Sequence, residues 1–231
     1  MSERHSQATA DILAAVHGTI TTVIGGLGEA ELMLPTRCAG WVIGDLLYHL
    51  LLDARRALRT FASPAAGPAD VDDVTYWRAY SRSGEQDAIS SAEAAAHARH
   101  VRIVAAAYPP GALAWEWGET SGAACRAARS CPHELVTTQG HVLATADFIA
   151  TLAVEAAVHY LDLTVNLPSA PAPDPAALLL VRQVLDGLLG APAPAGWDDG
   201  GYVLKGTGRV PLSGDDRAEL GALADRFPLF G

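Results

Sequence analysis

Hydrophobic residues recur at helical spacing along four long stretches in the first two thirds of the chain. In the second stretch the apolar side chains form one stripe, and in the fourth they lie on nearly every side, which predicts a central, buried helix. Four long helices joined by such connectors predict a bundle. The predicted helices cover residues 11–23, 43–61, 85–107 and 143–165, a short helix covers 70–81, and 112–135 has an irregular pattern.

The composition changes at Asn166, where a run rich in proline begins. Beyond it we expect a helix over residues 176–189, a pair of short strands over 201–212 and a final helix over 213–227. The chain is therefore predicted to be mainly α, with a bundle over residues 1–166 and a small α/β appendage over 167–231. About 65 residues are marginally stable alone, so we expect the appendage to dock on the bundle.

Composition and charge exclude several classes of protein. The chain has 231 residues, of which 50% are hydrophobic and 18% are charged, so intrinsic disorder is excluded. Sixteen basic against 26 acidic residues give a formal charge of −10, which disfavours nucleic acid and membrane surfaces as partners. We expect a cytoplasmic protein, because the N-terminus lacks an apolar signal core and the three cysteines suit no disulfide framework. The expected assembly is a monomer or a small homo-oligomer.

The fourth predicted helix carries three ionisable residues in one sector. At 100° per residue, Glu155 and His159 lie about 40° apart, and Asp162 lies about 20° from Glu155 one further turn on. The rest of this helix is apolar, so a buried polar cluster there has to be paired or bound to a metal. On the second helix, His49 lies on the polar flank together with Asp45, Asp53 and Arg56.

If the second and fourth helices are neighbours, His49, Glu155 and His159 converge as two imidazoles and a carboxylate. Such a set leaves a coordination position open, as catalytic zinc sites do. The E-x-x-x-H spacing is common, however. From spacing alone, an exposed His49 and a simple Glu155–His159 helix pair is the better supported interpretation.

Two motifs add a resemblance to a known family. Residues 36–50, TRCAGWVIGDLLYHL, resemble the T-x-C-x-G-W…D-L-x-x-H-L signature of the mycothiol-dependent maleylpyruvate isomerase N-terminal family, a branch of the DinB-like metal-binding four-helix bundles. Residues 155–163, EAAVHYLDL, resemble the family's E-x-x-V-H-x-W-D-L. Leu161 replaces the family's tryptophan, and the C-terminal segment is much smaller than the sterol-carrier-like domain of the isomerase itself. The likeness covers roughly residues 8–166.

The resemblance implies that His49, Glu155 and His159 are metal ligands. It also implies a divalent metal, with zinc expected, and mycothiol as cosubstrate or coenzyme. The expected enzyme activates a thiolate for addition to a small electrophile, as an isomerase or an S-transferase. Asp162 is expected behind the ligands rather than among them. Two alternatives stay open: a metal-binding or ligand-binding bundle without catalysis, and a hydrolase or lyase in which the metal activates water.

Other residues are weaker candidates. Arg56 and Arg209 are candidates for binding an anionic substrate or the thiol, although each could equally be a solvated arginine. Cys38 is expected to pack in a connector rather than act as a nucleophile. Cys125, Cys131 and His133 could bind a metal, but we expect them to be loop residues. Trp115 and Trp117 could line a pocket wall, but we expect them to be packing residues. We expect the remaining histidines, His17, His97, His100 and His141, to be helix-surface or satisfied polar residues.

Overall fold

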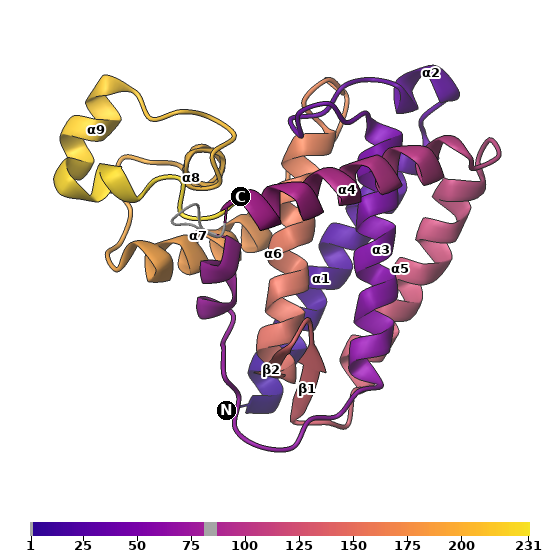
Figure 1. Cartoon of the computed structure of the whole chain (residues 1–231), viewed down its shortest axis with the longest axis horizontal. Helices are drawn as coiled ribbons and strands as arrows, with labels where there is room; N and C mark the ends of the chain where they lie inside the picture. Colours follow the sequence, from indigo (N-terminus) through magenta and orange to yellow (C-terminus); the bar gives the residue numbers. More distant parts are fainter. Residues whose placement is uncertain (1, 81–86) are drawn as a thin grey trace.

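The computed structural model describes residues 2–80 and 87–231, and four long helices pack side by side at its centre (Figure 1). α1 packs on α5 and α6, and α3 packs on the same two helices. A mainly α four-helix bundle with a small C-terminal appendage is therefore confirmed. The four helices are α1 (Ser2–Gly25), α3 (Ile43–Phe61), α5 (Ala112–Ser130) and α6 (Thr145–Leu163).

The strongest hydrophobic patterns gave the most accurate helices. α3 has the predicted bounds, and its stripe of apolar residues faces the core. α6 is the central helix, as predicted: Phe148, Ile149 and Leu163 have no exposed surface. α1 is longer than expected, and by length and composition its residues 6–25 could cross a membrane. The buried face of α1 packs on α5 and α6.

The third helix of the bundle was predicted wrongly. Residues 112–135, expected to be irregular, contain α5, whose buried positions include Leu113, Trp117, Ser121 and Ala128. This stripe consists largely of small residues, so its hydrophobic contrast is weak although its helical spacing is regular. The segment predicted as the third helix is α4 (Asp87–Ala106), which crosses the bundle and packs on α3; residues 85 and 86 lie outside the described residues.

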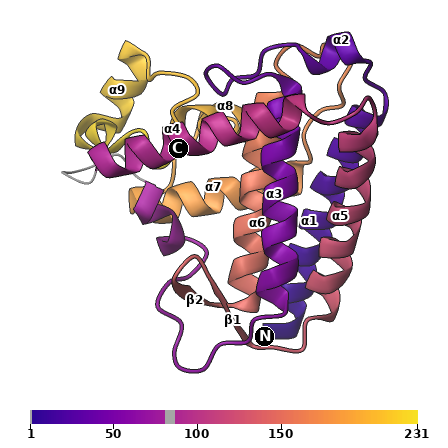
Figure 2. The ribbon, with the colours of Figure 1, turned by 45° about the vertical axis from the view of Figure 1, so that its right-hand side comes forward.

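Figure 2 shows α4 lying across the upper half of α3 and α6, nearly at right angles to them. The short helix predicted over 70–81 is a 3-10 helix, η1 (Thr75–Tyr80), preceded by a turn that the Asp72 side chain holds; Ser81 lies outside the described residues. A β-hairpin, which the sequence analysis did not predict, leads into α6. Its strands are β1 (Leu135–Thr138) and β2 (His141–Ala144), joined through Gln139 and Gly140, both at positive φ.

The C-terminal segment contains helices, and the strand pair predicted over 201–212 is wrong. Asp198 caps a helix there by accepting a hydrogen bond from the Gly201 amide, and Tyr202 and Val203 are buried. Gly206 approaches Leu185 so closely that a Cβ atom would lie 2.8 Å from it. The segment packs on α6, while its status as a separate domain over 167–231 stays a prediction. Its helices are α7 (Pro175–Leu189), α8 (Asp199–Gly206), α9 (Gly214–Leu220) and η2 (Gly221–Arg226).

Candidate metal centre

Side chains from α3 and α6 meet beneath α4. Glu155 Oε1 lies 3.3 Å from His49 Nε2 and 3.2 Å from His159 Nε2. The two imidazole rings stand almost perpendicular, at 88°, with their centroids 4.9 Å apart. One donor atom from each of the three residues therefore points to a common centre, and these atoms lie within 4.8 Å of one another.

The electrostatics of this cluster oppose the effect of burial. Burial alone would raise the pKa of Glu155, but hydrogen bonds and positive charge from His159 and His49 hold that pKa well below its usual range. Burial would likewise lower the pKa of His159. Hydrogen bonds to Asp162, Cys38 and Glu155 together outweigh the effect of burial and raise the pKa of His159 well above its usual value.

Asp162 lies behind His159. Its Oδ2 is 3.0 Å from His159 Nδ1, and the carboxylate is fully buried. Arg209, from the C-terminal segment, donates to Asp162 from Nη2 at 3.0 Å and from Nε at 3.3 Å. Burial would raise the pKa of Asp162, but His159 and Arg209 lower it to about 2. Arg209 therefore contacts the cluster through a buried carboxylate, and its Nη1 donates to the Thr207 carbonyl.

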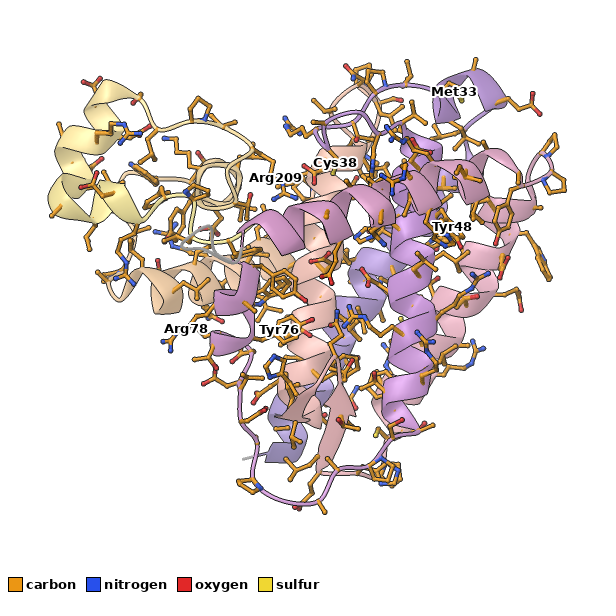
Figure 3. The ribbon with its side chains drawn as sticks, viewed as in Figure 1. Met33, Cys38, Tyr48, Tyr76, Arg78 and Arg209 are labelled. Atoms are coloured by element: carbon orange, nitrogen blue, oxygen red, sulfur yellow. The ribbon has the colours of Figure 1, made fainter. Side chains whose placement is uncertain are left out.

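The TRCAGW motif forms the connector that covers this end of α6. Thr36 Oγ1 accepts from the Cys38 amide at 3.1 Å and donates to the Trp41 carbonyl at 3.0 Å, while Gly40 has φ +76°. The Arg37 amide donates to the Asp162 carbonyl, near the last turn of α6. The motif is thus a tight turn that places Cys38 beside the cluster, and Figure 3 shows Cys38 and Arg209 at the same end of α6.

Among the side chains that the structure describes, two groups of donors are close enough to share a metal ion. The second group is Cys38, His159 and Asp162, with Cys38 Sγ 3.4 Å from Asp162 Oδ2. The Arg209 guanidinium already neutralises this carboxylate, and a cation placed there would be repelled by it. Among the described residues no such cation contacts the group of His49, Glu155 and His159, so the chemistry of this group fits a divalent cation better.

An unsatisfied oxygen beside the first group also fits a cation. Asp53 Oδ2 is buried and has no hydrogen-bond partner among the described residues, and it lies 3.6 Å from His49 Nε2. Asp53 Oδ1 accepts from Arg56 Nη2 at 2.9 Å. A buried polar atom without a partner is costly, and a bound cation nearby would offset that cost. Two imidazoles and a carboxylate are also the donor types that zinc uses at catalytic sites.

Arg56 extends the polar region toward the hairpin. Its Nη1 donates to Gln139 Oε1 at 2.7 Å and lies 3.4 Å from the Tyr76 hydroxyl. Figure 3 shows Tyr76, on η1, below α4. The sequence analysis identified Asp53 and Arg56 on the flank of His49 but missed Tyr76 and Gln139. The pair Gln139–Gly140 was the signal in the sequence that could have predicted the turn of this hairpin.

His97 is a third residue whose contact with this region the sequence did not predict. Expected as a surface or satisfied polar group, it is exposed on α4, and its Nε2 lies 3.2 Å from His49 Nδ1. The Trp41 ring packs against both imidazoles, with centroid distances of 5.3 Å to His49 and 6.2 Å to His97. No local motif marks His97, because its partner is 48 residues away in the sequence.

The weaker candidates lie elsewhere. Cys125 Sγ contacts His17 in the core, and Cys131 Sγ contacts the Phe61 carbonyl. These cysteines and His133 are in neither donor group of the described residues. Trp117 is buried and donates to Thr21, whereas Trp115 is 70% exposed, so the two do not line a common wall. His100 and His141 contact Tyr48 and Asp70.

The bundle matches a known protein family. Residues 13–164 match the family model described as "Mycothiol maleylpyruvate isomerase N-terminal domain". The matched region begins in the middle of α1 and ends directly after α6, so it contains both motifs and all of the bundle except the first half of α1. Searches of the curated proteins and of the solved structures return no match.

Proposed function

Because the chain belongs to the mycothiol maleylpyruvate isomerase N-terminal domain family, we propose that it is a metal-dependent enzyme that uses mycothiol. In this proposal His49, Glu155 and His159 hold one divalent cation, with zinc the expected metal. The observation that carries it is the convergence of His49 Nε2, Glu155 Oε1 and His159 Nε2 on one centre. When bound, the cation would act as a Lewis acid that lowers the pKa of a thiol at its open coordination position.

The chain's own residues supply the positions around that centre. Asp162, held by Arg209, fixes the orientation of the His159 ring, so His159 Nε2 keeps facing Glu155. Arg56 lies next to the Tyr76 hydroxyl and pairs with Asp53, the neighbour of His49. We assign to Arg56, and secondarily to Arg209, the binding of an anionic group on the electrophile or the thiol, although each arginine already pairs with a carboxylate.

The chemistry proposed is addition of a thiolate to a small electrophile. The thiolate sulfur adds to one carbon of an activated C=C double bond, and the π electrons move onto the conjugated carbonyl to give an enolate. Rotation about the resulting single bond and expulsion of the thiolate re-form the double bond as the other cis–trans isomer. If the sulfur stays attached, because the enolate takes up a proton or because a leaving group such as halide departs with its bonding electron pair, the product is an S-conjugate and the enzyme is an S-transferase. Both outcomes use the same residues. The expected cytoplasmic location supports a low-molecular-weight thiol as cosubstrate.

A rate comparison tests the proposal. The zinc-loaded chain is mixed with mycothiol, with cysteine or with no thiol, using maleylpyruvate and an activated aryl halide as electrophiles. We expect consumption only when protein, metal and thiol are all present, and faster consumption with mycothiol, because binding its sugar portion positions the sulfur. Turnover without thiol would contradict the proposal and favour a hydrolase or lyase.

A binding measurement complements the rates and serves as their control. Mycothiol added to the Co²⁺-loaded chain should produce a sulfur-to-cobalt charge-transfer absorption, and Glu155→Gln should weaken or abolish it. Ser121→Ala, in the core at 2% exposure and on a helix that does not contribute to the donor group, is the matched control. If thiol addition leaves the cobalt spectrum unchanged in the wild type, mycothiol does not reach the metal.

A further inference from the structure

Residues 92–100 of α4 leave most of their side chains exposed. Ala98 alone among them is half-buried, and His97 itself is exposed. Its Nε2 lies 3.2 Å from His49 Nδ1, and the two rings meet edge to face at 77°. Through this contact α4 reaches the candidate metal centre.

The two candidate histidine ligands have the same arrangement of partners. His159 turns Nε2 toward Glu155 and has Asp162 at Nδ1. His49 also turns Nε2 toward Glu155 and has His97 at Nδ1. Metal-bound histidines usually donate their second ring N–H to such a partner, which fixes the tautomer and the ring orientation.

We propose that His97 is a positioning residue that accepts a hydrogen bond from His49 Nδ1–H through its own Nε2. The bond keeps the lone pair of His49 Nε2 directed at the centre shared with Glu155 and His159. This inference rests on the proposed function, because it gives His97 a role only if His49 binds a metal. It adds α4, a helix outside the four of the bundle, to the parts of the fold that determine metal affinity.

The surroundings of His49 support the assignment. Asp53 and Glu155 face its Nε2, so neither competes for the Nδ1 proton. Trp41 packs against His49 and His97 alike and restricts rotation of both rings. Among the contacts of the described residues, His97 is the hydrogen-bond partner at His49 Nδ1.

Zinc affinities of the full-length chain, measured by competition with a chromophoric chelator, test the inference. His97→Leu removes the acceptor and should weaken binding by roughly 10–100-fold. His97→Gln offers an amide oxygen to the same proton and should stay within a few-fold of the wild type. His100→Leu is the matched control, because His100 is an exposed residue of α4 that contacts Tyr48 instead, and its affinity should not change.

A spectroscopic measurement separates positioning from a merely structural role. In the Co²⁺-loaded chain, the Nδ1 proton of His49 should exchange slowly with solvent in the wild type and in His97→Gln. In His97→Leu it should exchange faster, because the hydrogen bond is lost. Wild-type affinity in His97→Leu, or equally weak binding in His97→Gln and His97→Leu, would overturn the inference. His49→Ala in the same titration distinguishes the failures: if it also binds like the wild type, the proposed metal site itself is wrong.

Discussion

Two histidines on neighbouring helices of the bundle are equally buried but have opposite electrostatics. His17 on α1 and His159 on α6 are each 7% exposed. Burial is the main influence on His17 and lowers its pKa to about 4. The pKa of His159 is instead raised well above its usual value, although burial acts on it in the same direction.

The difference lies in what each ring faces. His17 meets the edge of Trp117 and the thiol of Cys125, and neither carries a negative charge that would stabilise an imidazolium. His159 meets Glu155 on one side and Asp162 on the other. Burial alone therefore makes a histidine a neutral packing residue. Carboxylates at both ring nitrogens make it part of a polar centre with a fixed orientation.

The largest expected effect is on metal content, which substitutions at His159 and at His17 should change differently. His159→Ala should lose the metal, as should His49→Ala and Glu155→Ala, because two protein ligands rarely hold zinc tightly. His17→Leu should retain about one metal per chain, since His17 belongs to neither donor group of the described residues. Elemental analysis after dialysis measures both. Equal metal content in all the variants would contradict the proposed metal site.

Features that depend on local sequence could be predicted, and features that depend on tertiary packing could not. The helix carrying His49 has a strong apolar stripe, and its bounds were predicted correctly. Glu155 and His159 share one helix face, so local geometry placed them together. α5 was missed because its buried stripe includes Ser121, Ala124 and Ala128, small residues with little hydrophobic contrast. His97 could not be identified either, since its contact depends on how α4 crosses α3, which is a property of tertiary packing.

The second prediction concerns the pH dependence of stability. The unfolded chain protonates His17 near its ordinary pKa of 6.5, whereas the folded chain does so near 4. Between these values the unfolded state binds more protons, so acidification favours unfolding. As the pH falls from 6.5 to 4, this residue should remove roughly 3 kcal/mol from the free energy of unfolding.

Denaturant unfolding at several pH values checks this expectation, with a chelator present so that release of metal does not contribute. His17→Leu has no titrating group at this position, and its free energy of unfolding should fall less steeply over the same range. Parallel curves for the wild type and His17→Leu would mean that the folded protein accommodates a charged His17.

The smallest effect concerns the partners behind His159. Asp162→Asn removes the charge at His159 Nδ1 and should lower zinc affinity by roughly 10–100-fold, less than the loss of a ligand. Arg209→Met leaves that carboxylate in place and removes only its cation, so it should lower affinity by less than Asp162→Asn does. Because both residues act through one contact, the double variant should bind zinc about as weakly as Asp162→Asn alone. Chelator competition measures all three. Loss of metal in Asp162→Asn as complete as in His159→Ala would show instead that Asp162 is itself a ligand.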